Sequence, residues 1–155
     1  MKKANVVTVI RVVGILVFVA AFFLPAVRDP GSVPGPGSRP LLGWSCALFA
    51  AASTGTILHW NTAQSTKEVV GSICLILSGW VNPLVFFYLT CSLWHRMVVI
   101  RRVFAVAIVL CYVATWVFFA QAPMVPLVGH YLWVLGGLLI LSGELVGQRV
   151  SRPAS

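Results

Sequence analysis

The sequence predicts an all-α fold: a polytopic membrane helix bundle with four full crossings, one short, broken or re-entrant helical element, and both termini in the cytoplasm. The composition indicates a membrane protein, because 59% of the residues are hydrophobic and 9% are charged, whereas soluble proteins carry about a quarter charged residues. Long uncharged runs define the helices, and the basic residues between them define the topology. The 155 residues are expected to form a single membrane domain, residues 1–155.

The first predicted helix covers about residues 6–27 and follows two lysines. Arg11 interrupts its apolar run, and we expect it to lie near the cytoplasmic end with its side chain extended toward the headgroups. The same segment also fits a secretory signal that ends at Ala26. A retained helix is favoured because the rest of the chain is equally apolar. Residues 28–40 alternate proline with glycine, which predicts a flexible, exposed loop.

Small residues recur every four positions in the second predicted helix, about residues 41–60. They are Gly43, Ala47, Ala51 and Gly55. This spacing stacks them near one helical face, where small side chains allow a neighbouring helix to approach closely. The pattern therefore predicts a helix that packs among the others.

The third predicted helix, about residues 69–94, is longer than one crossing requires, and Gly79, Asn82 and Pro83 lie at its middle. Proline cannot donate a hydrogen bond to the carbonyl group four residues earlier, so the helix is predicted to break at residues 82–83. Asn82 could then cap a new helix that has Pro83 at its first position.

The connection after the third helix carries three arginines, Arg96, Arg101 and Arg102, and is predicted to be a cytoplasmic turn because basic residues favour that side. Two further helices follow at about residues 103–122 and 131–148. If one element before this turn does not cross the bilayer, at least eight of the eleven basic residues lie inside. Either residues 41–60 or residues 69–82 can be that element.

The candidate polar groups inside the membrane are Glu144 and Arg11. We hypothesise that they form an ion pair between the last and first helices; the alternative is that each reaches the membrane surface separately. Lower thermal stability of Glu144→Gln in detergent would support the pair, and unchanged stability of both Glu144→Gln and Arg11→Gln would exclude it. Gly143 and Gly147 form a Gly-x-x-x-Gly pattern, which is typical of helix packing.

No pattern in the sequence is typical of an enzyme, a metal site or a cofactor site. The three histidines, His59, His95 and His130, are far apart in the chain and have no carboxylate beside them. The four cysteines lie singly within apolar runs. Paired carboxylates, nucleophile motifs and phosphate-binding glycine loops are all missing from the sequence. The basic residues flank apolar runs, so we assign them to anionic headgroups and not to nucleic acid.

Four short motifs resemble segments of small, uncharacterised multi-spanning bacterial membrane proteins. They are Phe23-Leu-Pro-Ala26, Gly43-Trp44, Trp80-Val-Asn-Pro-Leu84 and Gly129-His-Tyr-Leu-Trp133. The resemblance is spread over most of the chain, and it implies a location in the bacterial inner membrane. It implies no activity and no functional residue.

We therefore expect a small non-enzymatic integral membrane protein that acts as an accessory, assembly or partner-binding subunit. Its partners would be the lipid bilayer with its anionic headgroups, and another membrane protein or a second copy of itself. The alternative is a channel or transporter subunit that uses the helix break at Asn82 and Pro83. That alternative predicts a polar cavity lined by Asn82 and by serine or threonine residues.

Overall fold

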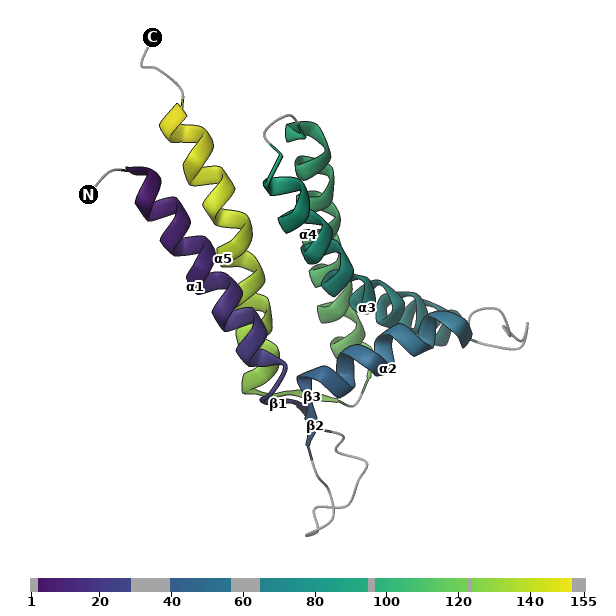
Figure 1. Cartoon of the computed structure of the whole chain (residues 1–155). Coiled ribbons are helices and arrows are strands. Elements are labelled where there is room, and N and C mark those ends of the chain that lie inside the picture. The colour runs from purple at the N-terminus through teal and green to yellow at the C-terminus, as the bar shows by residue number, and fades with distance from the viewer. Residues whose placement is uncertain (1–2, 29–39, 57–64, 95–96, 123, 152–155) are drawn as a thin grey trace.

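The computed structural model describes residues 3–28, 40–56, 65–94, 97–122 and 124–151 (Figure 1). Most of these residues are helical, as predicted. The five helices are α1 (Lys3–Ala21), α2 (Gly43–Thr56), α3 (Thr66–Ser92), α4 (Val98–Gln121) and α5 (Val128–Ser151). Three short strands lie between them: β1 (Pro25–Arg28), β2 (Leu41–Leu42) and β3 (Val125–Pro126).

Two of the helices, α3 and α4, are long and apolar enough to cross a membrane. The apolar segments of the other described helices are shorter and cover Val6–Ala21, Gly43–Ser53 and Val128–Gly143. With 14 residues, α2 is about 21 Å long, well short of a hydrocarbon core roughly 30 Å thick. Length and composition thus single out α3 and α4 as the membrane-capable helices of the described chain.

The helices form two pairs that diverge from a common base (Figure 1). In one pair α1 and α5 run antiparallel, so the start of α1 and the end of α5 lie at the same end of the molecule. In the other pair the second half of α3 runs beside α4. The first half of α3 lies beside α2, and these two segments extend to one side.

Glycines bring α1 and α5 into close contact. A β-carbon at position 136 would lie 2.5 Å from the amide nitrogen of Phe18, and one at position 14 would lie 2.9 Å from the amide nitrogen of Ile140. Gly143, predicted as a packing residue, also lies in this interface, where its missing side chain leaves room for the aliphatic part of Arg11. The backbones therefore pack closely over much of the helix length, as small residues permit.

Three short strands accompany the predicted helices. They form an antiparallel sheet in the order β2-β1-β3, in which Val27 pairs with both Leu41 and Pro126. The first helix accordingly ends at Ala21 and not at residue 27. Pro25 explains the early end, because proline lacks a donor and drives the residue before it out of helical geometry.

The small-residue face predicted on α2 is only partly correct. A β-carbon on Gly43 would collide with the backbone of α1, and Ala50 is buried where α2 meets Gly79 of α3. Ala51, however, is exposed. Four residues advance a helix by about 40° beyond a full turn, so a four-residue repeat rotates away from the contact and the preceding position, Ala50, replaces Ala51. The surroundings of Gly55 lie outside the described part of the chain.

The predicted break at residues 82–83 is wrong, because α3 continues through Pro83 without interruption. The helix instead changes direction along its length, so that its first half follows α2 and its second half follows α4 (Figure 1). Proline removes one backbone hydrogen bond and crowds the preceding turn, which is enough to kink a helix that neighbours hold on both sides. Asn82 is consequently not a helix cap.

Both membrane-capable helices begin earlier than predicted. Ser65 and Glu68 form a capping box at the start of α3, in which the Ser65 amide donates to the Glu68 carboxylate over 2.8 Å. Arg101 and Arg102, predicted in the turn between residues 94 and 103, belong instead to the first turns of α4. Arg96, residues 29–39 of the predicted loop, and the surroundings of Glu144 and Gly147 lie outside the described part of the chain.

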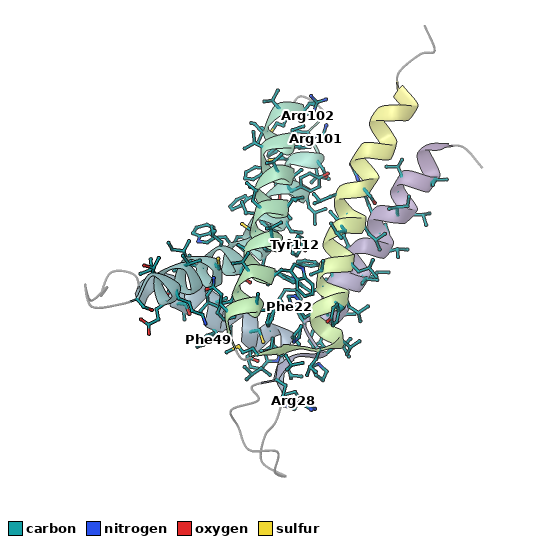
Figure 2. All side chains as sticks on the ribbon, turned by 180° about the vertical axis from the view of Figure 1, so that it is seen from behind. Phe22, Arg28, Phe49, Arg101, Arg102 and Tyr112 are labelled. Carbon is teal, nitrogen blue, oxygen red and sulfur yellow. The ribbon has the colours of Figure 1, made fainter. Side chains whose placement is uncertain are left out.

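The buried core joins the two helix pairs. It contains side chains of α1, α3, α4 and α5: Phe18, Val81, Val85, Tyr88, Ile108, Cys111, Tyr112, Ile140 and Leu141. Tyr112 reaches from α4 to α5, where its hydroxyl donates to the Trp133 carbonyl over 3.3 Å and packs against Gly137. In Figure 2, Phe22 and Tyr112 lie between the two pairs, next to the base.

Candidate functional site: a cavity at the helix junction

A cavity of about 160 Å³ lies where the helices and the small sheet meet. Its wall includes residues of every helix, together with β1 and the segment that precedes α5. The lining residues are Ala21, Phe22, Ala26, Val27, Leu41, Gly43, Cys46, Ala47, Phe49, Ala50, Leu75, Ser78, Asn82, Thr115, Phe118, Phe119, Met124, Gly129, His130 and Trp133. The wall is mainly apolar, and none of these side chains is a carboxylate, a lysine or an arginine.

Close backbone contacts build the base of this cavity. The amides of Gly43 and Trp44, which open α2, donate to the carbonyl groups of Leu24 and Phe22 over 3.0 Å each. At the start of α5, a β-carbon on Gly129 would lie 2.8 Å from the Pro25 carbonyl oxygen. The ends of α1, α2 and α5 are thereby fixed to one another, and side chains beside these glycines face a common space.

Asn82 of α3 contributes an oriented amide. The indole Nε1 of Trp133 donates to its Oδ1 over 2.9 Å, linking the middle of α3 to α5. This bond engages the amide oxygen and leaves the amide nitrogen without a partner among the described residues. Asn82 therefore presents hydrogen-bond donors to the cavity.

His130 is held within a cluster of aromatic rings. Its ring centroid lies 4.7 Å from that of Phe119, 5.4 Å from Trp116 and 5.5 Å from Trp133. The side chain is 6% exposed, and its Nε2 is buried with no hydrogen-bond partner among the described residues. Burying an imidazole nitrogen without a hydrogen-bond partner costs free energy, so a bound ligand that supplied a partner for this nitrogen would be favoured.

The remaining polar side chains of the wall are weaker candidates for hydrogen bonding to a ligand. The hydroxyl of Thr115 donates to the Cys111 carbonyl over 2.9 Å, which satisfies its proton within α4. Ser78 and Cys46 also line the cavity. The described residues contain no group of three or more histidine, cysteine, aspartate or glutamate side chains that could hold a metal ion. The cavity can thus supply shape, apolar contact and a few hydrogen bonds.

The residues singled out in the sequence fall in three places. Asn82, Gly43 and Ala47 line the cavity. Gly79 contacts α2 outside it, and Arg11 lies against Gly143 in the α1–α5 interface. The ion pair between Arg11 and Glu144 stays a hypothesis, because the side chain of Glu144 lies outside the described part. Figure 2 shows Arg101 and Arg102 at the end of the molecule opposite to Arg28.

No role in a site was predicted from the sequence for His130 or for Trp133. The available signal was their location within the Gly129–Trp133 motif. All four motifs quoted above contribute residues to the cavity wall, including Ala26, Gly43, Asn82 and His130.

Comparisons of the chain with protein-family models, with curated proteins and with solved structures find no match. The geometry of the cavity and the character of the outer surface therefore carry the functional argument.

Proposed function

We propose that the chain is a small integral membrane protein that acts without catalysis, as an accessory, assembly or partner-binding subunit. The observation that carries the proposal is an apolar outer surface. Leu16 of α1, Phe86 of α3 and Leu110 of α4 are 64%, 66% and 62% exposed, and similar side chains are exposed on α2 and α5. Lipid tolerates such a surface, whereas a soluble monomer exposes apolar patches of only a few hundred Å².

The low burial of α3 and α4 supports a membrane protein over a soluble protein that has these helices in its core. Only 28% of the most apolar window of each helix is buried inside the protein. The core helix of a soluble protein would instead be buried over most of its length. Both helices thus present most of their apolar surface outward, as membrane helices do.

The proposed topology has both termini and the α3–α4 connection on the cytoplasmic side of a bacterial inner membrane. In this arrangement α3 and α4 cross the bilayer together with α1 and α5, whose 19 and 24 residues span about 29 and 36 Å, and α2 does not cross. The antiparallel α1–α5 pair supports it, because the start of α1 and the end of α5 lie at the same end as the α3–α4 connection (Figure 1). Arg101 and Arg102 lie at that end, where the positive-inside bias expects them (Figure 2).

Partner binding is tested by cross-linking the full chain in its native membrane, followed by purification in a mild detergent and mass spectrometry. We expect one membrane protein, or a second copy of this chain, to be recovered reproducibly. A monomer recovered alone in repeated experiments would contradict a partner-binding role.

A channel or transporter subunit is the second candidate, and one observation favours it. Asn82, Ser78 and Thr115 line the same cavity, which is the combination that a transport site at this helix would use. The apolar remainder of the wall suits an uncharged substrate better than an ion. Flux of a transported solute into liposomes would be reduced by Asn82→Ala, and flux that is unaffected by this substitution would argue against this site.

A further inference from the structure

The cavity has the properties of a ligand site for a small, uncharged group. Its volume of about 160 Å³ is close to that of a 150 Å³ engineered cavity in another protein, which holds one benzene molecule. A whole lipid does not fit in this space, but a ring or a short acyl segment does. An ionised group would be strongly disfavoured, because the wall offers no opposite charge.

The cavity is open on the side of α2. Leu41 and Phe49 line it and are nevertheless 47% and 57% exposed, so they lie at its mouth. Ala47 lies on the same helix and lines the wall, while Ala51, one turn further along, is exposed. A ligand whose polar end enters the cavity can therefore extend an apolar tail past Leu41 and Phe49 to the outer surface.

Asn82 and His130 each offer a polar atom that has no partner among the described residues, and these two atoms define the polar end of that ligand. The amide nitrogen of Asn82 is a donor whose orientation is fixed by the bond from Trp133 to the amide oxygen. His130, nine-tenths buried among aromatic rings, is the second group, and its neutral imidazole carries one donor and one acceptor. Trp133 contacts both residues and forms an aromatic wall between them.

We propose that this cavity binds an uncharged apolar molecule through a carbonyl oxygen, which accepts one hydrogen bond from the Asn82 amide nitrogen and one from the His130 imidazole. Two kinds of membrane molecule share this chemistry: the ester of an acyl lipid and the ring carbonyl of an alkyl quinone. The site goes beyond the proposed function, because it requires neither a partner protein nor a particular number of crossings.

The test measures the melting temperature of the full chain in detergent at increasing concentrations of three probes. Dioctanoylglycerol represents the ester and a decyl-substituted benzoquinone represents the ring carbonyl. The dioctyl ether of glycerol matches the ester but lacks the carbonyl groups. A ligand that binds the folded state raises the melting temperature in proportion to its affinity, so each titration yields an apparent dissociation constant.

We expect one of the two carbonyl probes to raise the melting temperature of the wild-type chain, and the ether to have little effect. The probe that does so identifies whether the bound carbonyl belongs to an acyl ester or to a quinone ring. His130→Phe keeps an aromatic ring in the cluster and should weaken binding of that probe about tenfold, the effect of losing one hydrogen bond. The ligand-free His130→Phe chain should melt no lower than the wild type, because a buried polar atom without a described partner is removed. Asn82→Leu should weaken binding by a similar factor.

The matched pair Ala47→Leu and Ala51→Leu tests whether the probe occupies the cavity. Leucine at position 47 fills the space and should abolish the shift in melting temperature, whereas leucine at exposed position 51 should leave it unchanged. The proposal is overturned if neither carbonyl probe stabilises the wild type, if the ether stabilises it as strongly, or if Ala47→Leu responds like the wild type. Undiminished binding by His130→Phe would also contradict it.

Discussion

Replacing Trp133 by alanine is expected to lower the free energy of unfolding by about 3 kcal/mol, the lower end of the range for truncating a large buried aromatic side chain, because Trp133 is half-buried against the core. Trp133 contacts three aromatic residues closely: its ring lies 4.9 Å from Tyr112, 5.5 Å from His130 and 6.3 Å from Phe18. Its indole also donates the hydrogen bond to Asn82. Alanine removes these contacts together, so α5 loses its connection to the middle of α3.

Two further variants separate packing from hydrogen bonding. Trp133→Phe keeps a ring and loses the indole donor, so it should cost about 1 kcal/mol, the value of a typical hydrogen bond. Trp44→Ala removes the same type of side chain from an exposed position, 48% accessible on α2, and should change stability little. Unfolding in mixed micelles with increasing denaturing detergent gives the three free energies. Equal losses for Trp44→Ala and Trp133→Ala would contradict the assigned core.

Gly136→Ala is the second substitution with a large expected effect. The added β-carbon would lie 2.5 Å from the Phe18 amide nitrogen and 2.7 Å from its Cα, and these are backbone atoms that cannot move without shifting α1. We expect a loss at the upper end of the range for overpacking, about 3 kcal/mol. The α1–α5 pair would have to separate, so distances between labels on the two helices should increase in the same variant.

Gly71→Ala is the matched control on α3. The nearest atom to a β-carbon at position 71 is the Gln121 side-chain oxygen at 3.4 Å, an ordinary contact. Alanine is favoured over glycine in a helix by about 1 kcal/mol, so this variant should be neutral or slightly more stable. A Gly136→Ala protein as stable as Gly71→Ala would show that α1 and α5 do not pack as described.

The helical content could be predicted because it follows from long apolar runs and from the positions of proline and glycine. The limits of the helices were harder to predict. Pro25 ends α1 early, while Pro83 does not end α3, although both prolines lie within apolar runs. The difference is tertiary: residues after Pro25 pair with β2 and β3, whereas α3 is held by α2 before Pro83 and by α4 after it.

Prediction of the candidate site from the sequence is limited in the same way, because the cavity depends on tertiary contacts. Asn82 could be identified from the sequence, since an amide beside a proline within an apolar helix is unusual. Its partner Trp133 lies 51 residues away, and no local pattern indicates that pairing. His130 is surrounded by rings from α4 and α5, so its burial depends on how those helices meet. Short strands such as Leu41–Leu42 are likewise defined by their partners and not by their own residues.

The membrane topology is the central claim, and paired reporter fusions test it most directly. Alkaline phosphatase is active only outside the cytoplasm and green fluorescent protein is fluorescent only inside it, so each site receives both reporters. We predict fluorescence and no phosphatase activity at the carboxyl terminus and at residues 95–96, and the reverse for insertions within residues 29–39. Phosphatase activity at residues 95–96, or opposite locations for residues 95–96 and the carboxyl terminus, would contradict the account.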